Sequence, residues 1–255
     1  FSDHIGAIPL VIISPDDRNL IIEGSETRRK FIDGIICQTN KEYLNTLIDY
    51  NKTLKQRNAL LKMFYNDSEN IKKTIDIYDN HLSSNAQKIY ERRTEFLSDF
   101  IPIFKIRYKQ LSDDKENVEI IHKTDISESQ SLYKLLKNNL EKDLRFQFTT
   151  KGIHKDDLTF SINSFSVKKY GSQGQQKTFL IALKLAQFDY LSKLNSNPIL
   201  LLDDIFDKLD DNRVKQIINL VNEEKFNQIF ISDTNKIRSE NIIKKVNKSY
   251  KIFEI

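Results

Sequence analysis

Apolar residues recur at helical spacing through most of residues 25–112, and this periodicity constrains the fold more than any other feature of the chain. A first run ends at Asn66-Asp67-Ser68, a second run follows, and charged residues fill the positions between the apolar ones. A helix of ~40 residues is ~60 Å long. We therefore expect residues 27–64 and 69–108 to form two long antiparallel helices, an arm. A compact helical bundle would present the same pattern and is the alternative.

The two expected helices each carry an apolar stripe through which they would pack. The stripe of the first helix comprises Leu44, Leu47, Leu54 and Leu61, and that of the second comprises Ile71, Ile75, Leu82 and Ile89. Residues three, four and seven apart lie on one face of a helix, so each stripe is continuous.

Composition excludes several classes of protein. The 255 residues include six glycines, four prolines and a single cysteine, Cys37, so an internal disulfide and a thiolate zinc cage are both excluded. The four histidines have no metal-ligand spacing. No apolar run is long enough to cross a membrane, and the first residues do not resemble a signal peptide. We expect a reducing, cytoplasmic setting without membrane attachment. The net charge of +4 neither requires nor excludes nucleic acid.

Outside the helical run, strands and helices alternate in a way that is typical of an α/β protein. Continuous apolar strands separated by helices predict a mostly parallel sheet with flanking helices. The expected strands are 9–14, 118–121, 146–148, 158–162, 199–202, 228–231 and 250–253. The expected helices are 132–144, 172–194 and 212–222, with a further basic helix between the last two strands.

Two carboxylates, Asp203 and Asp204, follow the apolar strand 199–202. Ligands of open α/β sheets bind at the carboxyl ends of the strands. An aspartate there can hold Mg²⁺, and the next carboxylate can orient or deprotonate an attacking water. The alternative is structural: an N-cap with a second acid that favours the helix dipole.

A second motif lies upstream, where Tyr170-Gly171-Ser172-Gln173-Gly174 precedes an amphipathic helix. Ser172 can cap the helix, the glycines let a ligand approach the backbone, and the free N–H groups of the first turn form an anion site. The alternative is an ordinary serine-capped helix after a glycine turn.

The order of these motifs resembles the signature motif, Walker B strand and D-loop of the ABC-type ATPases, which include the SMC proteins. More narrowly, the chain resembles the RecF family of bacterial DNA replication and repair proteins along essentially its whole length. The blocks that carry the resemblance are 14–17, 28–33, 54–62, 152–158, 170–178 and 200–210. The resemblance implies the α/β head of an ABC/SMC-type ATPase with an inserted long-helix arm. The implied parts are head residues 1–24, arm residues 25–112 and head residues 113–255.

The resemblance also implies cofactors, site residues and partners. ATP and Mg²⁺ would be the cofactors, with Asp203 serving the metal and Asp204 the attacking water. Ser172, Gln173, Gly174 and Gln175 would meet the γ-phosphate of a nucleotide held by a second subunit, and Asp210 would lie in the D-loop across that interface. The partners would be DNA at single-strand gaps or single-strand/double-strand junctions, a second copy of the protein in an ATP-dependent dimer, and mediator proteins of the RecR and RecO type that help load RecA.

Departures from the family pattern shape these expectations. The chain contains no G-x-x-x-x-G-K-[ST] loop, so no Walker A phosphate site is present in it. Because the chain also begins with Phe1, we expect it to be a fragment that lacks the N-terminal Walker A region and to be inactive as an ATPase by itself. Ser232-Asp233-Thr234 stand where ABC ATPases often have a switch histidine, which leaves γ-phosphate sensing to Asp233 or Thr234.

Several basic residues are candidates for phosphate contacts, namely Arg28, Arg29, Arg92, Arg93, Lys244 and Lys245. A solvated charged face is the alternative for all of them, and Arg28 and Arg29 could instead be tied to Asp16, Asp17 or Asp33. For the chain as a whole, the main alternative function is a non-catalytic, SMC-like helical scaffold that binds DNA or protein. A third is another enzyme of the wider family, such as an ATPase paired with a nuclease domain.

Overall fold

The computed structural model describes residues 5–64, 68–112, 114–127, 130–194 and 197–204, together with isolated positions and the short stretches 228–234 and 249–253 further on. The chain divides into two compact units. The arm unit comprises Phe1–Ile5, Glu23–Ser98 and Ile120–Thr159, and the sheet unit comprises Gly6–Ile22, Asp99–Glu119 and Phe160–Ile255.

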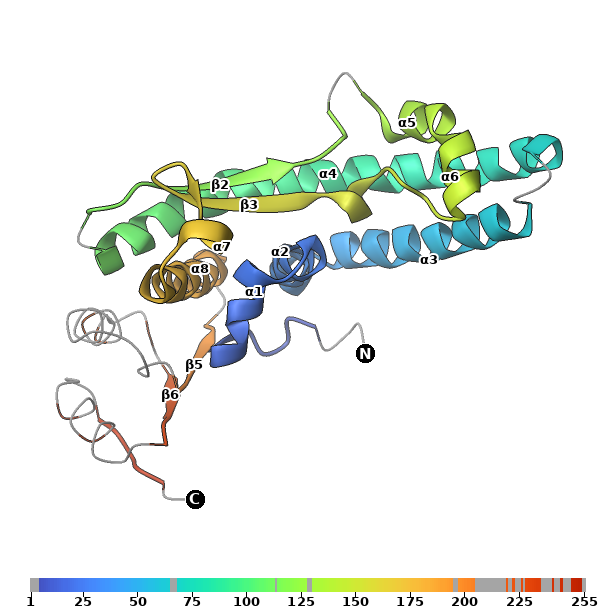
Figure 1. Cartoon of the computed structure of the whole chain (residues 1–255). Helices are drawn as coiled ribbons and strands as arrows, with labels where there is room; N and C mark the ends of the chain where they lie inside the picture. The colour runs from blue at the N-terminus through green and yellow to red at the C-terminus, as the bar shows by residue number, and fades with distance from the viewer. Residues whose placement is uncertain are drawn as a thin grey trace. The chain divides into compact units, whose positions relative to one another are not determined.

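Long helices dominate the arm unit, as the periodicity predicts (Figure 1). The helices are α2 (Ser25–Thr39), α3 (Lys41–Met63) and α4 (Ser68–Ser112), the last of which continues into the sheet unit. The expected helix 27–64 is in fact two helices, because Asn40 leaves the helical conformation and its side chain accepts a hydrogen bond from the Tyr43 N–H at 2.8 Å. Asparagine is a strong N-cap, so the chain restarts as a new helix at this point.

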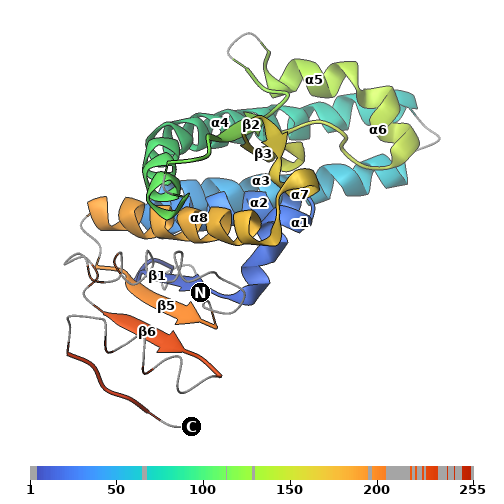
Figure 2. The same cartoon turned by 60° about the vertical axis from the view of Figure 1, so that its left-hand side comes forward.

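Helices α3 and α4 run antiparallel within the arm unit (Figures 1 and 2). Near the start of α3, Tyr43 contacts Arg93 of α4, and near its end Leu61 packs with Ile75. Between these points Arg57 binds Asp79. As the residue number rises along α3, the number of its partner on α4 falls, so the predicted antiparallel helix pair is confirmed.

The buried face of α3 differs from the predicted stripe. Leu44 and Leu61 are buried, but Leu47 and Leu54 are only half-buried. The interior positions between Leu44 and Leu61 are taken instead by Thr46, Tyr50 and Arg57. The interior of the arm is therefore partly polar, which an apolar pattern alone does not reveal.

The sheet unit contains a parallel sheet of order β1-β5-β6, formed by β1 (Leu10–Ile13), β5 (Ile199–Asp203) and β6 (Ile229–Ser232) (Figure 2). The long helix α8 (Gln173–Lys193) contacts β1 and buries most of its apolar residues. Its Phe179 packs against Phe104 and Tyr108 of α4, with ring centroids 4.7 and 5.8 Å away. The predicted strand–helix–strand order is thus confirmed for these elements.

A second sheet has the order β2-β3-β4, with β2 (Val118–Lys123), β3 (Asp157–Ile162) and β4 (Phe165–Ser166). Strands β3 and β4 are antiparallel, and the turn between them holds Asn163 and Ser164 at φ 47° and 67°. Positive φ at both central residues matches the twist of a two-residue hairpin.

Short elements connect these parts, and some of them correct the sequence predictions. They are η2 (Pro15–Arg18), α1 (Asn19–Ile22), α5 (Leu132–Asn138), α6 (Leu140–Phe146), η3 (Ile153–Lys155) and α7 (Val167–Tyr170).

The expected helix 132–144 is interrupted at Asn139, so it forms α5 and α6. The expected strand 146–148 is wrong, because α6 runs to Phe146 and Gln147 has a left-handed backbone. Residues 250–253 are also not a strand, and the expected helix 212–222 lies almost entirely outside the described residues. Among the residues described, we find no helix with the length and apolar character needed to cross a membrane.

Candidate nucleotide and DNA sites

Two carboxylates and a hydroxyl lie together at the carboxyl ends of β5 and β6. Asp203, the last residue of β5, pairs in register with Ser232, the last residue of β6. The Ser232 Oγ donates a hydrogen bond to Asp203 Oδ1 at 2.5 Å. The carboxyl ends of parallel strands are where α/β proteins bind their ligands. Asp203 is exposed at this edge.

Asp204 directly follows β5 and has a left-handed backbone with φ 47°. Its N–H donates to the Ser232 carbonyl at 3.1 Å, which fixes the peptide beside Asp203. Aspartate is one of the few residues other than glycine that adopts this conformation readily, and here it turns the chain at the end of β5.

Mg²⁺ prefers oxygen ligands and commonly binds one or two carboxylates together with phosphate and water. The exposed carboxylate of Asp203, with Asp204 and the Ser232 hydroxyl adjacent, fits that chemistry. Within the described part of the chain there is no group of three or more His, Cys, Asp or Glu side chains that could hold a metal by itself.

Ser172 caps helix α8, as the sequence predicts. Its Oγ accepts from the Gln175 N–H at 3.2 Å, and the Gln175 side chain accepts from the Ser172 N–H at 2.9 Å. This reciprocal pair is a capping box. The N–H groups of Gln173 and Gly174 have no acceptor within the helix, because the first turn of any helix lacks preceding carbonyls. The exposed end of α8 can therefore receive an anion.

A second set of contacts holds this helix end, and sequence reasoning missed it. The Gln175 Nε2 donates to Glu116 Oε1 at 2.7 Å, and the Tyr108 hydroxyl donates to the other oxygen of Glu116. The buried side chain of Gln176 donates to the carbonyl of Gly171 at 3.1 Å. The turn before α8 is thus fixed from both sides.

Four of the predicted positions are exposed or lie outside the described residues. Thr234 is exposed, two residues after the end of β6. Asp210 and Lys245 lie outside the described residues, and Lys244 is exposed.

Arg28 and Arg29 bind the block 152–158 rather than Asp16, Asp17 or Asp33. Arg28 makes a two-pronged ion pair with Asp157 at 2.7 and 3.1 Å. Arg29 donates to the Asp156 carbonyl at 2.6 Å, and burial, with the nearby charge of Arg93, lowers the pKa of Arg29. Both guanidinium groups therefore have structural partners.

Arg93 is buried and does not lie where a phosphate contact would. Its guanidinium binds Asp33 at 2.9 Å and Asp156 at 3.0 Å, and it donates to the Ile153 carbonyl. With 1% of its surface exposed, its charge is neutralised inside the arm unit. Arg93 is therefore not available on the surface for contact with DNA. Its neighbour Arg92 is partly exposed and pairs with Glu95.

The block 152–158 is the point where the arm helices are joined to the following strand. Gly152 has φ 134°, and a Cβ there would lie 2.7 Å from the Tyr50 hydroxyl. His154 contacts the same hydroxyl at 2.7 Å. Burial lowers the pKa of His154 to about 4, so the ring is neutral at physiological pH and serves packing rather than proton transfer.

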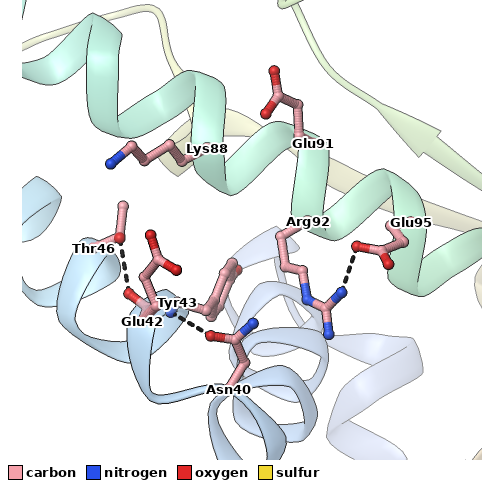
Figure 3. Close-up of a pocket in the computed structure, with 8 residues that line it drawn as sticks. All are labelled: Asn40, Glu42, Tyr43, Thr46, Lys88, Glu91, Arg92 and Glu95. Carbon is pink, nitrogen blue, oxygen red and sulfur yellow. Dashed lines mark hydrogen bonds and ion pairs between the residues drawn. The ribbon is translucent and has the colours of Figure 1, made fainter.

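A pocket of about 280 Å³ opens on the arm unit between α3 and α4 (Figure 3). Its lining mixes both signs of charge, and comprises Asn40, Glu42, Tyr43, Thr46, Lys88, Glu91, Arg92 and Glu95. Three acids outnumber two bases here, so the charge of the lining does not favour a phosphate.

An ionic network that the sequence did not predict lies deeper in the arm unit. Arg57 is fully buried and binds Asp79 at 2.6 Å, Asp143 at 2.7 Å and the Thr149 hydroxyl at 2.8 Å. Both aspartates are also fully buried. Burial raises the pKa of Asp79, although the Arg57 charge opposes this shift.

The structure combines a parallel sheet with acids at its strand ends, a capped helix that contains glycine, and long helices. This is the α/β head of an ABC/SMC-type ATPase with a long-helix insertion. The comparisons with known proteins specify the family. The chain is 52% identical to the DNA replication and repair protein RecF of Flavobacterium johnsoniae, over all of this chain and 71% of that protein. It is 46% identical to RecF of Phocaeicola vulgatus, covering 68% of it. The chain belongs to the RecF family.

Solved structures agree with this assignment. The recombination mediator protein RecF of the RecFOR pathway, in its RecF-ATPrS form, matches 92% of this chain with a TM-score of 0.81 and 30% identity. The RecF-ATP form matches 91% with a TM-score of 0.78 and 32% identity. The chain spans 65% and 64% of the length of those two proteins. No family model matches the chain.

Proposed function

We propose that this chain is the part of a RecF protein that receives the γ-phosphate of ATP from a second copy and so couples ATP to assembly on DNA. The observation that carries the proposal is the exposed, capped N-terminus of α8, fixed by Glu116 through Gln175. An anion at a helix N-terminus is stabilised by free N–H groups and by the helix dipole. Ser172, Gln173, Gly174 and Gln175 are the residues that would make these contacts.

The carboxyl edge of the parallel sheet would bind the metal ion and orient the attacking water. Asp203 would hold Mg²⁺, which would neutralise phosphate charge, and Asp204 would orient the attacking water. Asp210 and Thr234 would contribute contacts near the nucleotide. The ATP form of the solved RecF supports ATP as the nucleotide.

The remaining parts of the proposal concern location and partners. The assembly would be an ATP-dependent homodimer in the cytoplasm, bound to DNA at single-strand gaps or junctions. Proteins of the RecR and RecO type would join it and help load RecA. The place of the solved relative in the RecFOR pathway supports this assignment.

This chain by itself is expected not to hydrolyse ATP, because it contains no Walker A loop to supply the phosphate-binding amides and lysine. A phosphate-release assay on the purified chain checks this, with its Asp204→Asn variant as the control for contaminating ATPases. Turnover that disappears in the Asp204→Asn variant would contradict the expectation, since it would show a complete site in this chain.

DNA binding by the chain joined to a Walker A region is expected to be electrostatic and independent of sequence. The logarithm of affinity should fall with the logarithm of salt concentration with a slope of about −0.9 per phosphate neutralised. Charge reversal at Arg92, or at Lys244 together with Lys245, should flatten this slope, measured by fluorescence anisotropy on duplex DNA. Lys52→Glu on α3 is the matched control. Unchanged slopes for both reversals would remove these residues from the DNA surface.

A further inference from the structure

Two phenylalanines are exposed where the sequence predicted a strand. Phe146 and Phe148 are 51% and 41% exposed, and their ring centroids lie 5.8 Å apart. The left-handed backbone of Gln147 between them places both rings on the outside of the arm unit. Single exposed apolar residues are ordinary, but an adjacent pair of aromatic rings is a candidate binding surface.

A lysine lies beside this pair, and further cations are exposed on the helix that precedes it. The Lys155 Nζ lies 4.9 Å from the centre of the Phe148 ring. Lys142 and Arg145 of α6 are exposed as well, whereas Glu141 is the exposed acid of that helix. Its other acid, Asp143, is buried and bound to Arg57. The exposed charge around the rings is therefore mainly cationic.

The segment that carries the rings is firmly held. Asn58 accepts from both the N–H and the hydroxyl of Thr149, at 2.8 and 2.7 Å. Asp143 accepts in the same way from Thr150, at 2.9 and 2.6 Å. The next residues lead into Gly152, beside Tyr50. Because the backbone is anchored to the buried Arg57 network, the rings are presented without the cost of ordering a loose loop.

We propose that Phe146, Phe148 and Lys155 form a platform on which unpaired bases of single-stranded DNA stack. Bases of any sequence have a flat face that stacks on an aromatic ring, and nearby cations hold the phosphate backbone. The pairing of exposed rings with cations favours nucleic acid over an apolar protein partner. This inference rests on the proposed DNA binding. It adds that the DNA bound here is an unpaired strand, and it names the surface that binds it.

The absence of tryptophan from the chain allows a direct test. In a Phe148→Trp variant the new indole is the sole tryptophan, and stacking with a base should quench its fluorescence when a thymidine oligonucleotide is added. Ile48→Trp is the matched control, since Ile48 is 50% exposed on α3 of the same unit. The proposal expects quenching in the first variant and little change in the second.

Affinity supplies a second readout. The double variant Phe146→Leu/Phe148→Leu keeps apolar bulk but loses the aromatic faces, and should bind the oligonucleotide about tenfold more weakly. Its binding to duplex DNA should be nearly unchanged. Equal quenching in both tryptophan variants, or unchanged single-strand affinity, would overturn the platform while leaving the proposed function intact. Quenching by a mediator protein but not by DNA would assign the surface to protein docking instead. Failure of the unsubstituted protein to bind either DNA form would overturn the proposed function as well.

Discussion

Replacing Arg57 by methionine is expected to lower the free energy of unfolding by about 3–5 kcal/mol, because it removes one partner of a buried ionic network. Methionine fills much of the same space, so the main loss is electrostatic. Asp79 and Asp143 would remain buried without a cation, and the Thr149 hydroxyl would no longer accept a hydrogen bond from Arg57. Urea denaturation of the chain followed by circular dichroism measures the effect.

The pH dependence of this variant identifies the cause. Burial already raises the pKa of Asp79 in the intact protein, and the loss of Arg57 should raise it further. A carboxyl group whose pKa is higher in the folded than in the unfolded state binds protons more tightly when folded, so lowering the pH favours folding. The loss of unfolding free energy in the Arg57→Met variant should therefore become smaller as the solution is acidified. Lys55→Met, at an exposed position of the same helix, should change stability by less than about 0.5 kcal/mol. A deficit of similar size in both variants would contradict the account.

Ser172→Arg is expected to abolish ATP-dependent dimerisation, and with it hydrolysis, in a protein that carries this chain together with a Walker A loop. The exposed end of α8 would meet the γ-phosphate of a nucleotide held by the other copy, and a bulky side chain would block that approach. Binding of ATP to the monomer should be nearly intact, because Ser172 would contact the nucleotide of the other copy and not that of its own. Equilibrium binding of a fluorescent ATP analogue and analytical ultracentrifugation separate the two effects.

Ser172→Asp is the sharper variant of the same position. Aspartate is as good an N-cap as serine and favours the helix dipole, so helix α8 should remain as stable as before. Its negative charge would repel a phosphate, and dimerisation should still be lost. Ser172→Thr keeps the hydroxyl and should retain most of the ATP-dependent dimerisation. If Ser172→Asp loses nucleotide affinity as a monomer and still dimerises, Ser172 contacts its own nucleotide and the proposal is wrong.

Local patterns predicted the elements that are long and strongly periodic. Helices α4 and α8 and strands β1, β5 and β6 lie where apolar spacing placed them. The Ser172 cap was also predictable, since a capping box is encoded within four consecutive residues. The prediction of a strand at residues 146–148 was wrong. Alternating apolar residues are typical of a strand, but here both phenylalanine rings are exposed at the end of a helix.

Contacts between distant residues could not be read from the sequence. A charged residue at a helical position normally faces water, so nothing in α3 indicated that Arg57 would bind Asp143, far along the chain. The same holds for the hydrogen bond from Ser232 to Asp203 and for that from Gln175 to Glu116. Family resemblance named the site residues, but the partners that orient them follow only from the fold.

The mass of the assembled protein tests the central claim most directly, namely that nucleotide joins two copies through the N-terminus of α8. Light scattering should be recorded on the chain joined to its Walker A region, with ATP and Mg²⁺ and without nucleotide, for the unsubstituted protein and for Ser172→Asp. The account predicts that ATP doubles the mass of the unsubstituted protein and leaves Ser172→Asp monomeric. A mass that does not respond to ATP, or a Ser172→Asp variant that doubles like the unsubstituted protein, would contradict it.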